Sequence, residues 1–306
     1  MQNDDIVLSD VHLDENLSRI QENSNDDQCE SENYVTRFKF KSSDRRCSVT
    51  NNDSVTNNDS VTVDGDGDLV LPRQDEDFNV ILIKHSLSTK LDDVGRQVWP
   101  ASLMLSDFIL SNKDIFKCKV VIELGAGVGL CSIVVGMFCE KIICTDCLDS
   151  ALDLSQANFI LNTGLLAKAE NNHAVLKLDW NKNLNDLVIF SQDITDAFFE
   201  TIIHIININK KDQVDVFISL EKSAPKNVYV NVPVNRLNFT IEDKDIACPA
   251  YDHLTIWIQE LCTLNCKYAP SHIFSCRKID NIYQHFCYNR SDYLELWILE
   301  ARRITS

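Results

Sequence analysis

Three glycines spaced two residues apart form the segment whose residue types best suit ligand chemistry. They are Gly125, Gly127 and Gly129, and they follow Glu123, the acid near the end of a β-branched apolar run. Apolar residues resume at 130–138 with helical spacing, so the segment predicts a strand, a tight turn and a helix start. Glycine tolerates positive φ and carries no side chain that would block a ligand. Free N–H groups at a helix start could then hold the polar tail of a nucleotide-like cofactor.

The spacing of these glycines differs from the dinucleotide-binding fingerprint. That fingerprint requires G-x-G-x-x-G or a final alanine, whereas Leu130 stands three positions after Gly127. A nicotinamide-dependent oxidoreductase is therefore disfavoured. A turn that only connects a strand to a helix remains the alternative interpretation of the motif.

A second acid follows the glycines at a distance that suits sugar recognition. The apolar run 141–145 ends in Asp146, and a carboxylate about 20 residues after the glycines commonly binds a ribose diol. Asp146 could instead cap the helix predicted at 148–161, although Asp149 serves equally well for that purpose. The joint occurrence of glycines and acid favours the ribose role.

Alternating strand and helix patterns surround these residues. We predict strands at 79–85, 120–124, 141–146, 174–180, 214–220, 273–277 and 294–299, and helices at 99–110, 130–138, 148–161, 194–206 and 251–264. This alternation argues for an α/β fold with a mainly parallel sheet covered by helices on both faces. Ligands of such sheets bind at the carboxyl ends of the strands, where Gly125, Asp146 and Asp179 fall.

Charge and composition limit the possible partners. The 306 residues carry a net charge of −17, which argues against direct nucleic-acid binding. No run of 18 apolar residues predicts a membrane span, and the first residues lack the layout of a signal peptide. We therefore expect a protein of the nucleus or the cytoplasm, without membrane contact, and a monomer.

The acidity is concentrated before the predicted domain. Residues 1–77 hold 19 Asp and Glu against 7 Lys and Arg, and they include a short repeat within 48–62. We predict that residues 1–76 are a disordered acidic low-complexity region and that 77–306 form one domain, with a possible short strand at 34–41. The acidic run is a solvated spacer or, alternatively, an attractor for basic partners.

Twelve cysteines raise the question of a metal site. Cys144 and Cys147 have zinc-ligand spacing, and Cys262 and Cys266 form a looser pair. Neither pair is completed by a second C-x-x-C, so reduced and mostly buried thiols are the better interpretation. We predict no metal site.

Four segments of the sequence carry a family resemblance, which covers roughly residues 77–302. They are Gly95-x-x-Val98-Trp99 with Leu105, Glu123-Leu124-Gly125-Ala126-Gly127-x-Gly129-Leu130, Thr145-Asp146, and Leu178-Asp179-Trp180. Together they resemble the seven-β-strand protein methyltransferases, specifically the lysine-modifying group called family 16, and Arg236–Phe239 and Tyr251–His253 add to the likeness. The resemblance implies a Rossmann-like seven-stranded sheet sandwiched by helices, S-adenosylmethionine as cofactor, and a protein substrate, basic and lysine-rich, that is methylated on a lysine side chain.

The resemblance also implies roles for individual residues. Trp99 would form a wall of the cofactor pocket, and Gly125, Ala126 and Gly127 would line the path of the methionine tail. Glu123 is a further predicted cofactor-binding residue. Asp146 would accept bonds from the ribose hydroxyls, and Asp179 and Trp180 would border the adenine. Taken singly, both tryptophans could be ordinary core or anchor residues.

The sequence departs from the family pattern in two places. After Trp180 the chain passes through 181–192 directly to Asp193-Ile194-Thr195-Asp196, without the acidic-Val-x-Tyr element that follows the fourth strand in the family. Leu187–Phe190 is the candidate for that strand. An insertion at 223–235 also separates Lys222 from Arg236. A methyltransferase-fold binding module without turnover is therefore the alternative to an active lysine methyltransferase, and the sequence assigns no catalytic residue.

Overall fold

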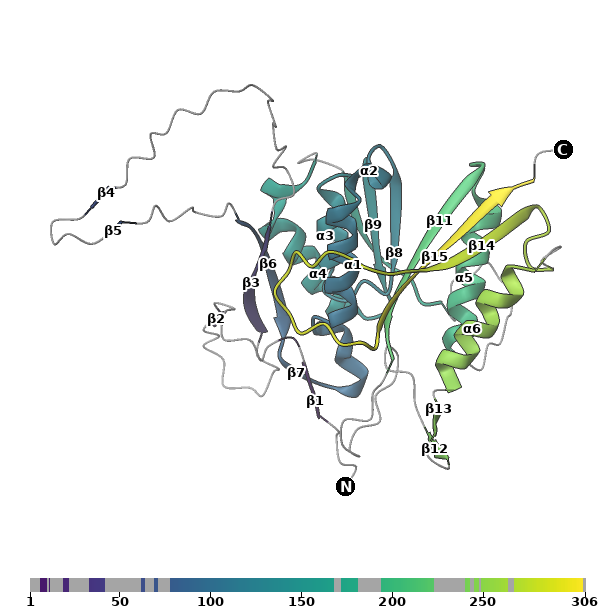
Figure 1. The fold of residues 1–306 in the computed structure, drawn as a ribbon, viewed down its shortest axis with the longest axis horizontal. Helices are drawn as coiled ribbons and strands as arrows, with labels where there is room; N and C mark the ends of the chain where they lie inside the picture. Colours follow the sequence, from purple (N-terminus) through teal and green to yellow (C-terminus); the bar gives the residue numbers. More distant parts are fainter. Residues whose placement is uncertain are drawn as a thin grey trace.

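The computed structural model describes most of the chain from residue 78 onward and short stretches before it (Figure 1). The described residues are 6–9, 11, 19–21, 33–41, 62–63, 69–70, 78–167, 172–180, 194–222, 240–242, 245–247, 249–263 and 267–304.

A three-stranded parallel sheet carries the glycine segment. Its order is β10 (His173–Lys177), β9 (Lys141–Asp146), β8 (Val120–Leu124), and both pairs are parallel. The helices α3 (Leu130–Gly136) and α4 (Asp149–Leu161), with the 3₁₀ turn η3 (Thr163–Leu165), connect these strands. The prediction agrees to within two residues for β8, β9, α3 and α4. β10 ends three residues before the predicted end at 180, and η3 was not predicted. The strands are the β-branched apolar runs of the sequence, which suit burial in a parallel sheet.

A second sheet of three antiparallel strands follows in the C-terminal half. Its order is β11 (Gln213–Glu221), β15 (Leu294–Arg303), β14 (His272–Ile279). The helices α5 (Ile194–Ile208) and α6 (Pro249–Leu261) pack on this sheet and share with it a core that includes Phe199, Trp257, Phe274 and Leu299. In Figure 1 both helices lie beside β14 and β15.

The helix α1 (Pro100–Ser111) joins the two sheets and continues into α2 (Lys113–Phe116). Pro100 occupies its first turn, where the missing N–H costs nothing. On one side the Cys131 thiol of α3 donates to the Ser102 carbonyl, at 3.1 Å. On the other side the Ser219 hydroxyl of β11 donates to the Ala101 carbonyl, at 2.7 Å, and the Phe108 and Phe217 rings lie 5.3 Å apart.

The expected seven-stranded sheet is not confirmed. Among the described residues β8 and β11 are edge strands of separate sheets, and the candidate fourth strand at 187–190 lies outside those residues. The side chains of β8 reflect this, since Val120 is 64% exposed and Ile122 is 38% exposed. A fully paired central strand of an α/β sheet would bury both residues.

The predicted disorder of the N-terminal region is not confirmed at residues 33–41, which form the strand β3. β3 (Asn33–Lys41) pairs along its whole length with β6 (Phe78–Ser86), and β2 (Arg19–Gln21) pairs with β3. Phe38 and Phe40 of β3 are almost fully buried in the main core. The alternation seen at 34–41 therefore marks a strand that belongs to the folded domain.

Shorter elements complete the described chain. They are β1 (Ile6–Leu8) paired with β7 (Ser88–Lys90), β4 (Thr62–Val63) with β5 (Leu69–Val70), β12 (Thr240–Glu242) with β13 (Asp245–Ala247), and the 3₁₀ helix η2 (Leu91–Arg96). None of the described helices is long and apolar enough to cross a membrane. The repeat at 48–62 and the insertion at 223–235 fall almost wholly outside the described residues.

Candidate cofactor site

The glycine turn between β8 and α3 has the backbone that its sequence predicts. Gly125, Gly127 and Gly129 all have positive φ, at 68°, 55° and 80°. A side chain in this left-handed region would be strained. Gly129 is the N-cap of α3, so the turn leads directly into the helix.

The three glycines face different neighbours. A Cβ on Gly127 would lie 2.9 Å from the Gly95 carbonyl oxygen, and a Cβ on Gly129 would lie 2.9 Å from the Ser155 hydroxyl. Close packing therefore accounts for both of these glycines. A Cβ on Gly125 would lie 3.4 Å from the Trp180 indole, and Gly125 itself is exposed. Gly125 is thus the glycine of the turn that is exposed to solvent, and the Trp180 ring lies next to it.

Asp146 is built into the turn from the end of the neighbouring strand β9. Its Oδ2 accepts from the Gly127 N–H at 2.8 Å, and its Oδ1 accepts from the Leu148 N–H at 3.0 Å. A carboxylate has about four lone-pair sites, and the Cys147 thiol also hydrogen-bonds this one, so about one acceptor position is left for a further donor. The capping interaction with Leu148 and a ribose role are therefore compatible, and the two interpretations of Asp146 do not exclude each other.

Asp179 and Trp180 follow β10 and approach the same edge of the sheet. The Leu178 N–H donates to the Asp146 carbonyl at 2.9 Å, which ties the chain before Asp179 to the end of β9. Partial burial, followed by the charges of Asp146 and Asp179, raises the pKa of the Cys147 thiol, so both carboxylates lie near that thiol. The structure therefore brings together Gly125, Gly127, Asp146, Asp179 and Trp180.

Trp99 lies beside the turn rather than over it. Its indole N–H donates to the Val94 carbonyl at 3.0 Å, and its ring packs against Val7 and Val94. Gly95, the next residue, is the one that touches Gly127. The described contacts of Trp99 thus connect it to the turn through the 3₁₀ helix η2.

Glu123 is the most perturbed carboxyl of the site. Burial raises its pKa to about 7, although hydrogen bonds from Ser132 and Cys131 lower it in part. The Ser132 hydroxyl of α3 donates to its Oε2. Glu123 therefore lies under the turn, where it connects the end of β8 to the first turn of α3, and it titrates near neutral pH.

Two side chains that the sequence did not single out hold the turn from α4. The Ser155 hydroxyl donates to the Gly127 carbonyl at 2.7 Å, and the Asn158 amide donates to the Val128 carbonyl at 2.9 Å. Asn158 also bonds both backbone groups of Lys84 in β6. Both side chains are fully buried. The sequence offered one signal for these two residues, namely polar side chains three positions apart on an otherwise apolar helix face. Their hydrogen-bond partners could not be predicted, because this required knowing that α4 packs against the turn.

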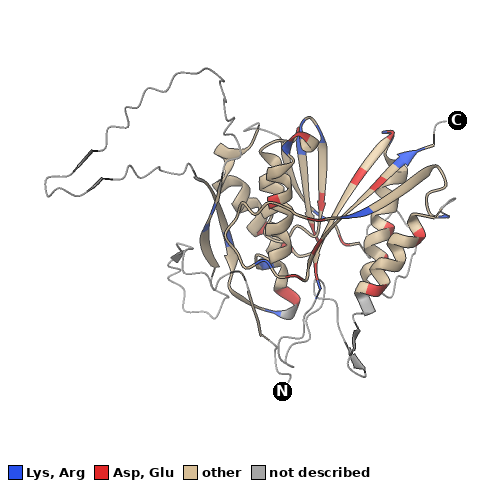
Figure 2. Ribbon diagram, in the orientation of Figure 1, with Lys and Arg blue, Asp and Glu red and all other residues tan. Residues whose placement is uncertain are grey.

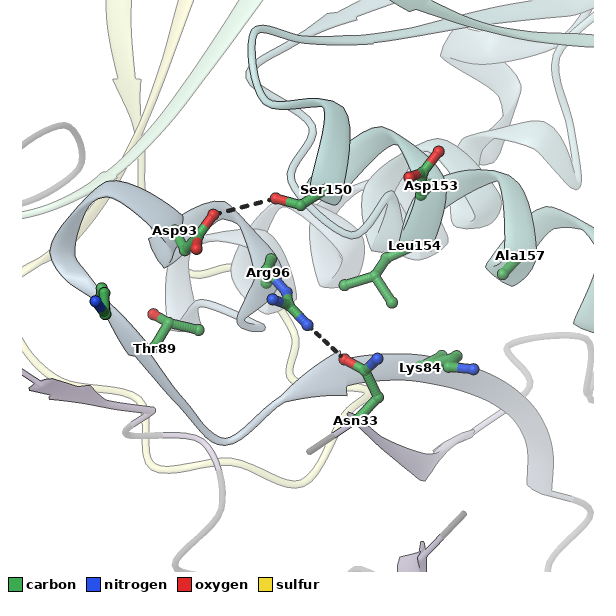
Figure 3. A pocket seen from close by; sticks show the side chains of 10 residues that line it. Asn33, Lys84, Thr89, Asp93, Arg96, Ser150, Asp153, Leu154 and Ala157 are labelled. Carbon is green, nitrogen blue, oxygen red and sulfur yellow. Dashed lines mark hydrogen bonds between the residues drawn. The ribbon is translucent and has the colours of Figure 1, made fainter. Parts of the chain in front are cut away.

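A cavity of about 730 Å³ lies elsewhere, between η2, α4 and the edge of β3 (Figure 3). Its walls include Lys84, Asp93, Arg96 and Asp153. In Figure 3 the Ser150 hydroxyl points toward Asp93, and Arg96 points toward Asn33, so part of its polar lining is already paired. None of the eight predicted site residues lines this cavity.

Within the described part of the chain, no group of three or more His, Cys, Asp and Glu side chains is arranged to hold a metal ion. Burial raises the pKa of the Cys144 thiol to about 12, which keeps it protonated. Cys147, its partner at zinc-ligand spacing, is exposed. Cys144 and Cys147 therefore differ sharply in environment.

The residues present fit a nucleotide-like cofactor. The turn exposes Gly125, Asp146 retains acceptor capacity for hydroxyl groups, and Trp180 offers an aromatic face next to both. These are the three kinds of group that a ribose, its base and an attached polar tail require.

Comparison with known proteins agrees with this geometry. The family model described as lysine methyltransferase matches residues 79–231, half of the chain. Methyltransferase-like protein 22 of Homo sapiens is 31% identical over 261 residues, which cover 76% of this chain and 60% of that protein. The mouse protein of the same name is also 31% identical and is covered to 58%, so the chain spans about three fifths of the length of these relatives.

More distant similarities are shorter or weaker. The protein-lysine N-methyltransferase EEF2KMT of Homo sapiens is 29% identical over 112 residues, which cover 34% of each chain. Among solved structures, M. jannaschii TYW2 in complex with AdoMet aligns with a TM-score of 0.38 and 14% identity, covering 73% of this chain and 83% of that one. The family match rests on the half of the chain that contains the glycine turn, Asp146, Asp179 and Trp180. The chain therefore belongs to the lysine methyltransferase family, whose cofactor is S-adenosylmethionine.

Proposed function

We propose that this chain is an S-adenosylmethionine-dependent protein-lysine N-methyltransferase. The observation that carries the proposal is the joint placement of Gly125, Asp146 and Trp180 at the carboxyl ends of β8, β9 and β10. Membership of the lysine methyltransferase family supports the choice of a lysine side chain as acceptor.

In this proposal all of the predicted residues except Glu123 border the cofactor. Gly125, Ala126 and Gly127 would pass the methionine tail, and Asp146 would accept bonds from the ribose hydroxyls through its remaining acceptor position. Asp179 and Trp180 would border the adenine. Trp99 would form a wall near η2, and Glu123 would support the turn from below through Ser132.

The chemistry places modest demands on the protein. S-adenosylmethionine supplies a methyl group that is already activated by its sulfonium. What the chain must do is place the target amine in line with that methyl group and exclude water, so that the lysine reacts as a neutral amine. We assign no general base, because the acidic-Val-x-Tyr element is absent from the sequence after Trp180.

The substrate that fits this chain best is a basic, lysine-rich protein. The net charge of −17 would attract such a partner and would disfavour nucleic acid. A monomer in the nucleus or the cytoplasm is part of the same proposal.

A methyl-transfer assay tests the proposal directly. The purified chain would be incubated with S-adenosylmethionine labelled in its methyl group and with cell extract, and labelled proteins would be separated on a gel. We expect labelled bands that disappear in the Asp146→Ala variant. Absence of label, while a related active enzyme labels the same extract, would count against the proposed activity.

A binding module without turnover is the second candidate. One observation favours it, the missing acidic-Val-x-Tyr element. Calorimetry with S-adenosylhomocysteine separates the two candidates. Binding without any labelling would support the inert module, and binding with labelling would exclude it.

A further inference from the structure

Trp180 needs support to hold its ring over the glycine turn. It stands three residues after β10 ends at Lys177, and it is only half-buried. Two atoms of its indole lie 3.4 and 3.5 Å from the position of a Cβ on Gly125. A large aromatic ring at the end of a strand can adopt several rotamers, so a neighbouring group must select this one.

The neighbour is Phe198, which comes from α5 rather than from the sheet. The Trp180 and Phe198 ring centroids lie 5.1 Å apart, and the ring planes are inclined at 54°. This separation is within the 4.5–7 Å range typical of favourable aromatic pairs. Phe198 is itself half-buried, so one side of its ring is available to Trp180.

A row of further rings supports Phe198 from behind. The Phe198 and Phe199 centroids lie 5.5 Å apart, and Phe199 stacks on Trp257 of α6 at 5.3 Å with an interplanar angle of 8°. Phe199 is fully buried. The row therefore runs from the glycine turn into the core between α5 and α6.

Polar contacts fix α5 relative to α6 at the same place. The Trp257 indole N–H donates to Asp196 Oδ1 at 2.6 Å, and His253 Nε2 lies 2.6 Å from the same oxygen. Asp196 precedes Phe198 by two residues in the first turn of α5. The start of α5 is thus held by α6, and this holds the Phe198 ring in place.

We infer that Phe198 is a positioning residue for the cofactor site, because it holds the Trp180 indole over Gly125 in the orientation that receives the adenine. This inference rests on the proposed function, in which Trp180 borders that base. A helix of the C-terminal half thereby sets the affinity of a site whose other residues come from the parallel sheet. Phe198 does not touch the reacting atoms and acts only through Trp180.

Binding of S-adenosylhomocysteine by the full chain, measured by calorimetry, tests this inference. Phe198→Leu is expected to weaken binding by roughly 3- to 10-fold, the range that one aromatic pair supplies. Phe198→Tyr keeps the ring and is expected to bind within 2-fold of the wild type, as an estimate from the same pair energy.

Phe274→Leu provides the matched control for lost stability. Phe274 is buried in the same core as Phe199 and Trp257, but it lies on β14 and its ring neighbour is His272. This variant is expected to lower the melting temperature at least as much as Phe198→Leu does, with unchanged affinity. Equal weakening in both variants would mean that general loosening of the core is responsible, and this would overturn the inference.

A double-mutant cycle then shows whether Phe198 acts through Trp180. We expect Trp180→Leu to weaken binding and Phe198→Leu to cause no further loss in the Trp180→Leu background, since residues that act as one unit are non-additive. Additive losses would overturn the inference. Failure of the wild type to bind would overturn the proposed function itself, whereas wild-type binding with an unaffected Phe198→Leu variant would overturn only the role of Phe198.

Discussion

At the scale of single residues, the glycine turn is held by close contacts rather than by glycine flexibility alone. Asp146, Ser155 and Asn158 each hydrogen-bond a backbone group of the turn. The Gly95 carbonyl of η2 also lies close to Gly127. A substitution at Gly127 must therefore move backbone, which is costlier than moving a flexible side chain.

Gly127→Ala tests this rigidity. The new Cβ would lie 2.9 Å from the Gly95 carbonyl oxygen at a φ of 55°, so the backbone of the turn must shift, and the Gly127 N–H that bonds Asp146 shifts with it. We expect the free energy of unfolding to fall by about 1–3 kcal/mol and cofactor binding to weaken by about tenfold or more.

The control for that variant is Gly164→Ala in η3. A Cβ at Gly164 would meet no atom within 4 Å, and Gly164 has no positive φ. Chemical denaturation and calorimetry should show wild-type stability or slightly more, with unchanged binding. Equal losses in both variants would contradict the special role of Gly127.

Glu123→Gln tests the raised pKa of Glu123. Burial raises the folded pKa to about 7, above the ordinary value of 4.5. The native state therefore binds more protons than the unfolded state between these values, and the contribution of Glu123 to stability is full below pH 4.5 and is lost as pH rises through 7. We expect the variant to gain on the order of 3 kcal/mol relative to the wild type from pH 4.5 to 8.

Denaturation with urea at several pH values measures this difference. Glu140→Gln, which alters an exposed carboxyl, serves as control and should follow the wild type at every pH. A constant difference between Glu123→Gln and the wild type across the range would show that Glu123 does not titrate there.

Sequence reasoning predicted several residues that the structure brings to one edge of the sheet. The glycines, Asp146, Asp179 and Trp180 could be found because each stands at the end of a recognisable strand. Ser155, Asn158 and Phe198 could not be found, because their roles depend on which elements pack together. That information resides in tertiary contacts between positions up to 74 residues apart.

At the scale of elements, one buried carboxylate links four segments of the C-terminal half. Glu295 of β15 accepts from Lys222 at 2.7 Å, Lys278 at 2.9 Å, Tyr251 at 2.9 Å and Trp297 at 2.9 Å. These donors come from the end of β11, from β14, from α6 and from β15 itself. Figure 2 shows charged residues gathered where β11 and β15 meet.

Glu295→Gln should lower stability in a pH-dependent way. Burial alone would raise the pKa of Glu295, but hydrogen bonds from Lys222, Lys278, Trp297 and Tyr251 lower it to about 2. A depressed pKa contributes stability that is present above pH 4.5 and lost as pH falls through 2. We expect a loss of on the order of 3 kcal/mol at pH 7 that shrinks toward zero near pH 2.

Glu300→Gln on the same strand is the control for that variant. Glu300 pairs with Arg302, whose side chain is 65% exposed, and such surface pairs contribute little. The two variants would be compared by denaturation at pH 7, 4 and 3. A Glu295→Gln loss that does not change with pH would contradict the depressed pKa.

At this scale the sequence predicts the elements but not the pairing of the strands. Periodicity placed the core strands and helices, because each has a regular apolar pattern. It did not predict that β8 and β11 would be edges of separate sheets among the described residues. Residues 187–190, the candidate fourth strand, lie outside the described residues, and their apolar run is too short to fix the strand order from the sequence.

At the scale of the whole molecule, β3 attaches the N-terminal region to the domain. Phe38 and Phe40 enter the main core, and Phe40 also bridges to Phe286 in the connection between β14 and β15. Composition could not show this, because 33–41 is a short apolar pattern inside a strongly acidic region.

Phe38→Ala tests whether β3 belongs to the cooperative fold. Phe38 is 1% exposed, so its truncation leaves a cavity, and we expect a loss of about 3–5 kcal/mol in the free energy of unfolding. Lys39→Ala, at the exposed neighbouring position, should stay within about 0.5 kcal/mol of the wild type. Thermal unfolding of both variants would contradict the assignment if the Phe38→Ala midpoint were unchanged.

The bridge between Phe40 and Phe286 connects segments almost at opposite ends of the sequence. Their rings lie 5.4 Å apart, and the neighbouring amides of His285 and Phe286 bond to buried Asp107. Opening either segment exposes the other, so their amide protons should exchange with deuterated solvent at similar rates. Thus, β3 can pair with β6 early in synthesis, but its Phe40 end gains its last partner only when the final third of the polypeptide has been made.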